Sequence, residues 1–321
     1  MFERICAGLA LGTLTTPAIR LQGGFTHRMF RLKTDRGDYA VKLLNPEIMA
    51  RPDAPDNYRT AEGFEALLEA AGLPILPARM IGGRKLQCVE GQHLYVFDYF
   101  PGRPLQGEEI TPAHCGRIGT VLARIHAVPV PERPEAENVP GPTILWEDLA
   151  AGLLGSADTR AEGELLAAAA PQLARRTAAA MEAVRSLPAA MALCHNDMDP
   201  KNVLWQGQDF RIIDLECLGI ADPRQELLDL AIAWSHGNET CFKAFVSAYC
   251  EAGGAGLTDA ALVYDSRRNI LDWLAYNARR ALVEDPEERR IATGQIRASL
   301  EQLQEEAAVR EHVLHWLTEL A

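Results

Sequence analysis

Residues 193–205 read LCHNDMDPKNVLW, and residues 212–216 read IIDLE. Asp197 and Asn202 lie five positions apart in the first stretch, and Asp214 lies in the second, which is mostly apolar. Amide and carboxylate oxygens are ligands that suit Mg²⁺, and a further carboxylate can accept a proton from an attacking hydroxyl. Phosphoryl transfer from a nucleotide needs these groups and little covalent chemistry from the protein. The two stretches therefore predict a site for phosphoryl transfer.

The order of these residues also resembles that of a known family. The pattern His195-x-Asp197-x-x-x-x-Asn202, followed by Asp214, is similar to the catalytic loop and metal-binding aspartate of the aminoglycoside phosphotransferase and choline kinase family. Its members are small-molecule kinases with a protein-kinase-like fold, whereas protein kinases carry H-R-D and D-F-G at these places. The resemblance implies that Asp197 is the catalytic base, that Asn202 and Asp214 hold Mg²⁺, and that ATP or GTP is the phosphate donor. It implies a structural role for His195.

The first hundred residues predict a small sheet with one helix. Residues 30–33 and 39–44 are rich in β-forming side chains and flank a turn, which is typical of a hairpin. Residues 86–89 and 94–97 predict a second hairpin. Residues 60–71 lie between the hairpins, and their periodic apolar side chains predict a helix.

The chain beyond residue 100 predicts a larger helical body. Thr111 is expected to cap a helix that ends at His126, and residues 203–218 have strand character. Further helices are predicted at residues 159–186 with a break at Pro171, and at residues 224–235, 240–251, 259–283 and 295–320.

Together with the resemblance, this layout predicts an α+β, protein-kinase-like two-lobe fold. A small N-terminal antiparallel sheet with one helix would precede a larger, mainly helical C-terminal lobe. Residues 1–98 are the predicted nucleotide-binding lobe, and residues 99–321 are the predicted catalytic and acceptor-binding lobe.

Lys42 closes the strand that ends in Ala-Val-Lys. The resemblance implies that this lysine binds the nucleotide phosphates, although an isolated lysine at a strand end is usually a surface residue. Its expected partner is a glutamate of the following helix, where Glu62, Glu65 and Glu69 compete. The spacing in the family favours Glu62.

Other nucleotide contacts are weaker predictions. Gly23 and Gly24 precede the first hairpin, where a phosphate-covering loop is expected, but a Gly-Gly pair before a strand is usually just a turn. The resemblance implies that the carbonyl of Asp98 and the amide of Phe100 bind the adenine edge. Glu216 lies two residues after Asp214 and is a candidate for binding a substrate cation.

Composition narrows the possible partners. The chain of 321 residues has a formal net charge of −12, which disfavours non-specific nucleic-acid binding. Residues 1–100 sum to +1 and residues 101–321 to −13, so the acidity lies in the predicted acceptor lobe. A cationic acceptor fits this asymmetry, although solubility alone explains it almost as well.

The location of the protein is also constrained by sequence. No long apolar run predicts a membrane span, and the short apolar stretch from Ile5 to Leu14 follows an acidic Glu3, unlike a signal peptide. The seven cysteines are scattered and odd in number, which indicates free thiols in a reducing compartment. We therefore expect a cytoplasmic protein.

The sequence thus predicts a phosphotransferase that uses Mg²⁺ and ATP or GTP to phosphorylate a hydroxyl of a small, cationic molecule. Aminoglycosides, choline, ethanolamine, homoserine and amino sugars are all candidate acceptors, and the oligomeric state is open. The alternative is a catalytically silent nucleotide-binding regulator or scaffold with a kinase-like fold. Its mark would be the loss of Lys42, Asp197, Asn202 or Asp214, and all four residues are present.

Overall fold

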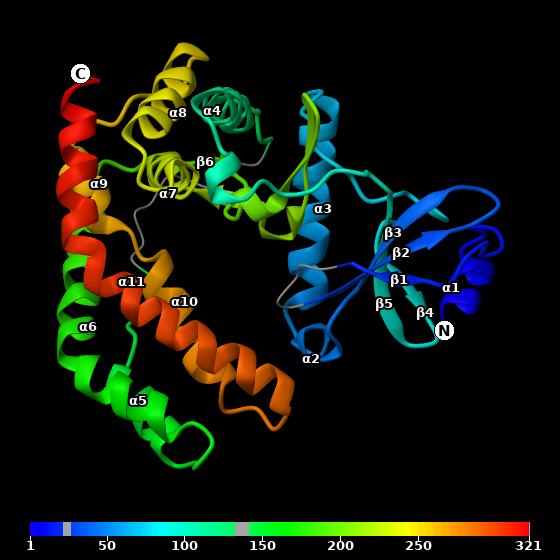
Figure 1. Ribbon diagram of the computed structural model, residues 1–321, viewed down its shortest axis with the longest axis horizontal. Helices are drawn as coiled ribbons and strands as arrows, with labels where there is room; N and C mark the ends of the chain where they lie inside the picture. The colour runs from blue at the N-terminus through cyan, green and yellow to red at the C-terminus, as the bar shows by residue number, and fades with distance from the viewer. Residues whose placement is uncertain (22–26, 132–140, 321) are drawn as a thin grey trace. The chain divides into compact units, whose positions relative to one another are not determined.

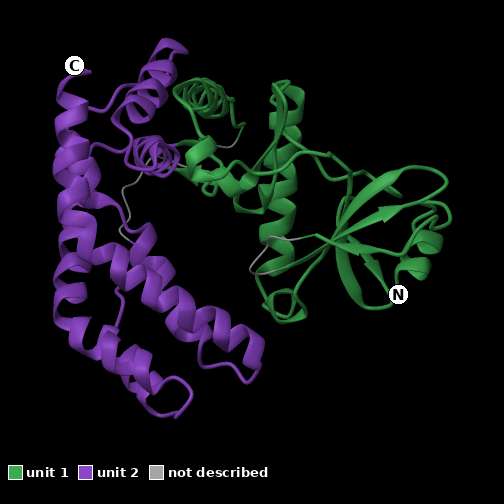
Figure 2. Ribbon diagram, in the orientation of Figure 1, with its two compact units in different colours: residues 1–133, 192–221 green, residues 134–191, 222–321 purple. Residues whose placement is uncertain are grey.

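Contacts within the chain divide it into two compact units (Figure 2). The computed structural model describes residues 1–21, 27–131 and 141–320. The first unit consists of residues 1–133 and 192–221, and the second of residues 134–191 and 222–321. The division at residue 98 into a nucleotide-binding lobe and an acceptor-binding lobe concerns function, and it stays a prediction.

An antiparallel sheet dominates the N-terminal part of the first unit (Figure 1). The described residues contribute five strands to it, in the order β1-β2-β3-β5-β4. Both predicted hairpins are present, with Phe30 opposite Val41 in the first and Cys88 opposite His93 in the second. The strands are β1 (Ile19–Arg20), β2 (Arg28–Lys33), β3 (Asp38–Leu43), β4 (Gln87–Val89) and β5 (Gln92–Asp98).

The short helix α1 (Phe2–Gly8) covers one face of this sheet. Its buried side chains Ile5 and Cys6 belong to the same apolar cluster as Leu32 and Val41 of the first hairpin. Side chains alternate between the two faces of a strand, so β2 and β3 can supply this cluster from one face. The sheet therefore has an apolar core that fixes β3. Lys42, the lysine predicted to bind the nucleotide phosphates, lies in this strand.

Helix α3 (Ala54–Ala70) follows the one-turn helix α2 (Pro46–Met49). It begins six residues before the predicted start, and Tyr58, Glu65 and Leu68 lie on its buried face. Because this face includes a glutamate, the rotation of the helix decides which carboxylate lies inside the unit.

Two short antiparallel ribbons complete the first unit, together with a helix. The predicted strand region 203–218 contains a hairpin and then a 3₁₀ turn rather than one continuous strand. Thr111 caps the helix as expected, since its side chain accepts a hydrogen bond from His114 N–H. These elements are α4 (Pro112–His126), β6 (Ala192–Cys194) paired with β9 (Gly219–Ala221), β7 (Val203–Gln206) paired with β8 (Asp209–Ile212), and the 3₁₀ turns η1 (Gly107–Glu109), η2 (Pro200–Asn202) and η3 (Leu215–Cys217).

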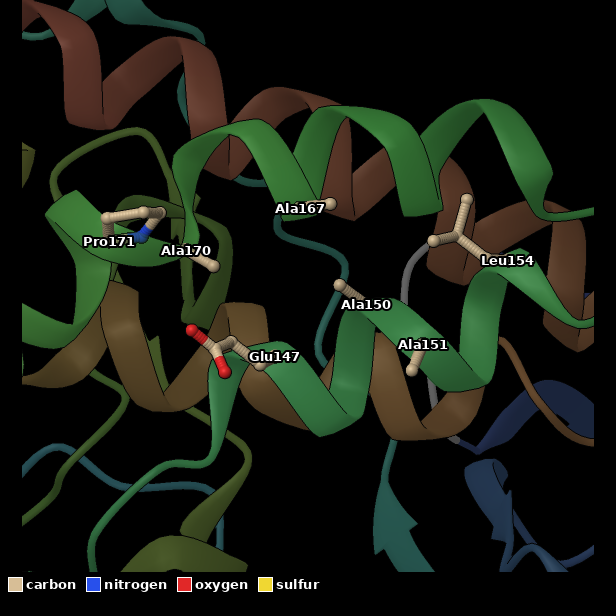
Figure 3. A pocket seen from close by; sticks show the side chains of 7 residues that line it. All are labelled: Glu147, Ala150, Ala151, Leu154, Ala167, Ala170 and Pro171. Atoms are coloured by element: carbon tan, nitrogen blue, oxygen red, sulfur yellow. The ribbon is translucent and has the colours of Figure 1, made fainter.

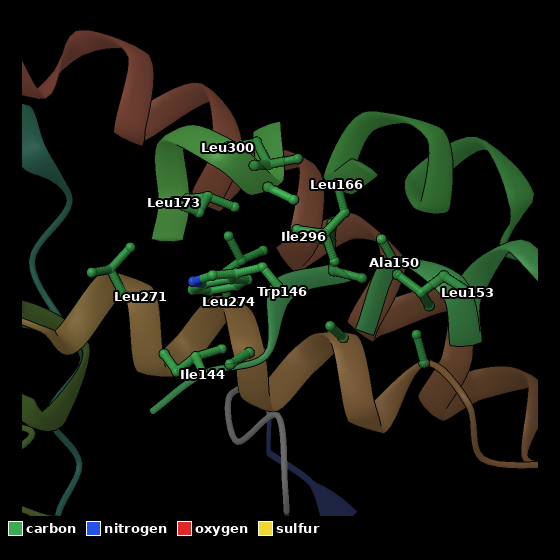
Figure 4. Close-up of a cluster of buried hydrophobic side chains, with 14 of the residues drawn as sticks. Ile144, Trp146, Ala150, Leu153, Leu166, Leu173, Leu271, Leu274, Ile296 and Leu300 are labelled. Atoms are coloured by element: carbon green, nitrogen blue, oxygen red, sulfur yellow. The ribbon is translucent and has the colours of Figure 1, made fainter. Parts of the chain in front are cut away.

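The secondary structure described for the second unit is helical, and apolar side chains from four of its helices share one core (Figure 4). Trp146 is fully buried there, and its Nε1 donates to Thr177 Oγ1 at 3.0 Å. None of the helices that the structure describes has the length and apolar content to cross a membrane. The helices are α5 (Trp146–Leu154), α6 (Arg160–Ser186), α7 (Pro223–Ser235), α8 (Glu239–Glu251), α9 (Ala260–Ser266), α10 (Asn269–Arg280) and α11 (Pro286–Thr318).

Two helix predictions in this unit were wrong. Helix α6 continues through Pro171, because Ala170 and Leu173 beside it are buried in the core, and this packing outweighs a local cost of about 3 kcal/mol. The predicted helix 259–283 is interrupted at Arg267, whose backbone is extended. The buried guanidinium of Arg267 forms an ion pair with Asp229 of α7, which holds the chain in this turn.

A cavity lies between α5 and α6 (Figure 3). Its volume is about 170 Å³, and it contains none of the residues predicted to carry chemistry. It is lined by Glu147, Ala150, Ala151, Leu154, Ala167, Ala170 and Pro171.

Candidate active site

The predicted catalytic loop connects β6 to β7 within the first unit. The segment with Asp214 connects β8 to β9, and the Ile213 N–H donates to the carbonyl oxygen of Asn202 at 2.9 Å. The pairing of β6 with β9 and of β7 with β8 therefore brings both sequence motifs together.

Asn202 holds Asp197 in place. Its Nδ2 donates to the main-chain oxygen of Asp197 at 2.7 Å and to Asp197 Oδ2 at 2.8 Å. His195 is fully buried, and its Nδ1 accepts from the Asp197 N–H at 3.3 Å. Its Nε2 then carries the proton and donates to the carbonyl of Ile213 at 3.2 Å. These contacts give His195 the loop-holding position that the resemblance implies, while the catalytic role of Asp197 stays a prediction.

Lys201 balances part of the charge of Asp197. Its Nζ lies 2.6 Å from Asp197 Oδ1 and 2.9 Å from Asp199 Oδ2. Burial raises the pKa of the Asp197 carboxyl above its usual range, and the Lys201 ammonium opposes part of this rise. A carboxylate with a raised pKa is a better proton acceptor than an ordinary aspartate.

We expect Lys201→Met to move the acidic limb of the pH–rate profile to higher pH. A base works in its ionised form, so activity is lost as the pH falls through the pKa of Asp197. Removing the ammonium removes a contribution that lowers this pKa, so the carboxyl protonates at a higher pH. The measurement is kcat/KM against pH for both proteins. A limb that stays in place or moves to lower pH would contradict the assignment of Asp197 as the titrating base.

Lys42 is the buried cation of this site. Its side chain is 10% exposed, and its Nζ lies 2.5 Å from Asp214 Oδ1 and also forms an ion pair with Glu216. Burial alone would lower the pKa of Lys42, but the two carboxylates outweigh burial and raise it. Burial likewise would raise the pKa of Glu216, yet Lys42 and His27 lower it to about 2. Lys42 and Glu216 are therefore both charged at neutral pH.

Asp214 has an unusual backbone conformation. Its φ of 64° lies in the left-handed region, which aspartate tolerates better than most residues. At this position the chain leaves β8 and enters η3, so the carboxylate reaches Lys42 of β3 although 172 residues separate them. Such strain at one residue is typical of functional sites.

Glu62 does not occupy the position expected from the sequence. Its Oε1 accepts from the Leu86 N–H at 3.0 Å and from the Tyr95 hydroxyl at 2.8 Å. Lys42 is paired with Asp214 and Glu216, so the expected pair between Lys42 and Glu62 is not formed in the structure. The physical reason is that each side chain is engaged elsewhere: Glu62 accepts two hydrogen bonds, and Lys42 is paired with two other carboxylates.

Glu65 and Lys85 form a second buried ion pair in the same unit. Their side chains are 8% and 6% exposed, and Lys85 Nζ lies 2.7 Å from Glu65 Oε1. The same oxygen accepts from the Ala78 N–H at 2.7 Å. Burial raises the pKa of Glu65, and Lys85 lowers it again in part. This pair fixes α3 to the segment that precedes β4.

We expect Lys85→Met to lower the free energy of unfolding by about 3–5 kcal/mol near neutral pH, because it leaves a buried carboxylate without its cation. The loss should shrink as the pH falls, since Glu65 has a raised pKa and becomes neutral earlier than an exposed glutamate. Urea unfolding at several pH values measures this. The control is the double variant Lys85→Met/Glu65→Gln, which should recover part of the stability. A loss that is the same at every pH would contradict the charge argument.

The predicted adenine contacts lie at the end of β5. Asp98 is opposite Tyr39 of β3, and the next residue, Tyr99, donates its N–H to the carbonyl of Asp38 at 2.9 Å. Main-chain groups alternate in direction along a strand, so the carbonyl of Asp98 faces away from β3. The ring of Phe100 lies 5.3 Å from the guanidinium carbon of Arg211. Binding of adenine by Asp98 and Phe100 stays a prediction.

The predictions for the phosphate-covering loop and for Glu216 have different outcomes. Gly23 and Gly24 lie outside the described residues. Glu216 contacts Lys42 and His27, so its cationic partner in the structure is a lysine of the protein itself. The sequence reasoning missed His27 as a partner of Glu216. No local pattern indicates this pair, because 189 residues separate His27 from Glu216.

Asn202 and Asp214 fit a magnesium ion by the chemistry of their donors. The amide nitrogen of Asn202 makes the hydrogen bonds to Asp197, which leaves the amide oxygen on the other side of the planar group. Asp214 uses Oδ1 for Lys42 and has a second carboxylate oxygen. Hard oxygen donors of this kind suit Mg²⁺. The assignment of Asn202 and Asp214 as magnesium ligands stays a prediction.

Comparison with known proteins supports the same chemistry. The family described as "Phosphotransferase enzyme family" matches residues 18–263. A homoserine kinase from Acidiphilium cryptum is 27% identical over 186 residues, which are 57% of this chain and 53% of that protein. A homoserine kinase from Granulibacter bethesdensis is 27% identical over 165 residues, or 50% of this chain and 49% of that protein. The chain thus spans about half the length of the curated relatives that it matches.

Solved structures share the fold at low sequence identity. A spectinomycin phosphotransferase in complex with ADP and spectinomycin has a TM-score of 0.70 and 14% identity, over 94% of this chain and 95% of that chain. A choline/ethanolamine kinase family protein from Mesorhizobium loti has a TM-score of 0.63 and 20% identity, over 98% of each chain. The predicted α+β, protein-kinase-like fold is confirmed by these likenesses.

Proposed function

Because the chain belongs to the phosphotransferase enzyme family, we propose that it moves the terminal phosphate of ATP or GTP to a hydroxyl of a small, positively charged molecule. The observation that carries this proposal is the assembly of the predicted residues within one unit. Asn202 holds Asp197, Ile213 joins the two motifs, and Lys42 pairs with Asp214.

In this proposal Asp197 orients the acceptor hydroxyl and takes its proton during transfer. Its raised pKa favours this role, and Asn202 and Lys201 fix the direction of its two oxygens. Most of the rate enhancement would come from positioning and charge neutralisation, as is typical of phosphoryl transfer.

Lys42 would bind the phosphates of the nucleotide with its ammonium group, which is held in β3 by the sheet and aimed by Asp214 and Glu216. Asn202 and Asp214 would hold Mg²⁺, which neutralises charge on the phosphates when it is bound. Asp98 and Phe100 would bind the adenine through main-chain groups, and Gly23 and Gly24 would cover the phosphates. Glu62 would act through its contacts with β5 rather than through Lys42.

The acceptor class follows from charge and from the relatives. Residues 101–321 carry a net charge of −13, which attracts cations over a long range. Homoserine, choline and ethanolamine, which appear in the names of similar proteins, each combine a hydroxyl with a positively charged nitrogen. A small hydroxyl compound with such a nitrogen is therefore the proposed acceptor.

The test is an ADP- or GDP-release assay with Mg²⁺ and either nucleotide. The acceptors are homoserine, choline, ethanolamine, glucosamine, spectinomycin and kanamycin, and Asp197→Ala serves as the control for release without acceptor. The proposal expects at least one acceptor to stimulate release in the wild type and not in the variant. If all acceptors stay silent with both nucleotides, the proposed transfer is wrong.

The second candidate is a regulator or scaffold that binds nucleotide without transferring phosphate. The specific observation in its favour is that the Lys42 ammonium is already paired with two carboxylates of the protein. Nucleotide binding in titration calorimetry, combined with silence in the release assay, would favour this candidate.

The cysteines of the described residues are free thiols, which agrees with the proposed cytoplasmic location.

A further inference from the structure

His27 connects several elements of the first unit. Its side chain is only 3% exposed, and its Nε2 lies 3.1 Å from Glu216 Oε1. Its Nδ1 lies 3.0 Å from the backbone nitrogen of Asn45, at the corner between β3 and α2. The Tyr58 hydroxyl of α3 lies 3.2 Å from Nε2. A histidine placed before β2 thus reaches η3, the end of β3 and α3.

The hydrogen bonds define the proton position on this ring. The N–H of Asn45 donates to Nδ1, so Nδ1 carries a lone pair and not a proton. The neutral ring then has its proton on Nε2, which faces the Glu216 carboxylate. Because a charged acceptor binds a donor more strongly than a neutral hydroxyl does, the N–H is directed to Glu216 rather than to Tyr58.

Glu216 is at the centre of the arrangement. One of its oxygens accepts from His27, and the other pairs with the Lys42 ammonium. A carboxylate on a short 3₁₀ turn has freedom to rotate about its side-chain bonds, and a second fixed partner removes that freedom. His27 therefore limits where Glu216, and through it Lys42, can lie.

We propose that His27 is a positioning residue, which aims Glu216 at Lys42 and so sets the place of the ammonium that binds phosphate. This inference rests on the proposed function for the role of Lys42. It assigns to His27 and Glu216 the task that the sequence predicted for a glutamate of α3.

Two substitutions separate the contacts of His27. In His27→Asn the amide oxygen can replace Nδ1 and keep the contact with Asn45, but the side chain is too short to reach Glu216. In His27→Gln the amide nitrogen lies near the place of Nε2 and can still donate to Glu216. His93→Asn is the matched control, because His93 lies in β5 of the same unit.

The experiment measures binding of Mg²⁺ with a non-hydrolysable ATP analogue by calorimetry. Loss of one hydrogen bond to a charged group is expected to weaken binding about tenfold in His27→Asn. His27→Gln and His93→Asn should stay within about threefold of the wild type. Because His27 acts through Glu216, His27→Asn should have little further effect in a Glu216→Gln background.

Equal binding by His27→Asn and the wild type would overturn the inference, and so would equal losses in His27→Asn and His27→Gln. Additive effects of His27→Asn and Glu216→Gln would overturn it as well. A second readout needs no nucleotide: the ¹⁵N NMR signals of His27 should show the ring proton on Nε2, with a change in Glu216→Gln. If the wild type binds no nucleotide, the proposed function fails. The imidazole signals then decide the inference, because a ring protonated at Nδ1 or unchanged in Glu216→Gln contradicts it.

Discussion

Asp197→Ala is expected to lower the rate of phosphoryl transfer by roughly two to four orders of magnitude, which is the usual contribution of a general base. In the structure this carboxylate accepts from Asn202 and is paired with Lys201, so its oxygens have a defined direction. Burial raises its pKa, which suits a group that must take up a proton. The measurement is kcat with the best acceptor from the release assay.

Binding of the nucleotide should change little in this variant, because Asp197 is proposed to contact the acceptor and not the phosphates. Calorimetry with Mg²⁺ and the ATP analogue tests this. Alanine also removes the carboxylate that accepts from Asn202, so Asp197→Asn is the second variant. It keeps the shape and one acceptor oxygen but cannot take a proton.

Both variants should lose transfer, and Asp197→Asn should bind nucleotide as the wild type does. Asp199→Ala is the control, since Asp199 is a neighbouring carboxylate that also pairs with Lys201. Transfer that survives in Asp197→Asn would show that another group is the base.

The catalytic loop could be predicted from sequence because its contacts are local. Asp197 and Asn202 lie five residues apart, and the hydrogen bonds between them form within one loop. Asp214 follows after a single hairpin, so the second motif is brought back by a short connection. The two hairpins and the capped helix α4 were predicted from local patterns for the same reason.

The partners of Lys42 could not be predicted in this way. Glu62 and Glu65 lie on one helix at similar distances from the lysine in sequence, and the rotation of α3 decides where each carboxylate goes. That rotation depends on the burial of Tyr58 and Leu68 against other elements. Glu216 is 174 residues from Lys42, and its direction depends on the 3₁₀ turn after the left-handed Asp214.

Packing also overrode local propensity in the second unit. Pro171 predicted a break, but the buried side chains around it keep α6 continuous. Arg267 has good helix propensity, yet its backbone is extended where its buried side chain pairs with Asp229. In both cases a contact distant in sequence outweighed the local preference.

Lys42→Met is expected to reduce phosphoryl transfer by at least about 10²–10³-fold, because it removes a cation that would stabilise charge on the phosphates. It should also lower the free energy of unfolding by about 3 kcal/mol, since it leaves Asp214 and Glu216 close together without their shared cation. Transfer is measured in the release assay and stability by urea unfolding. A variant that keeps transfer would show that Lys42 does not act on the phosphates.

The two effects of Lys42→Met can be separated, because they have different physical causes. The loss of stability comes from unbalanced negative charge, so Lys42→Met/Glu216→Gln, which removes one of the two carboxylates, should recover part of it. The loss of transfer comes from the missing ammonium, and the same double variant cannot restore that group. We therefore expect a protein that is more stable than Lys42→Met and equally inactive. If the double variant recovered both stability and transfer, Lys42 would serve only to balance the charges of Asp214 and Glu216. That result would contradict the proposed role of Lys42 in binding the phosphates.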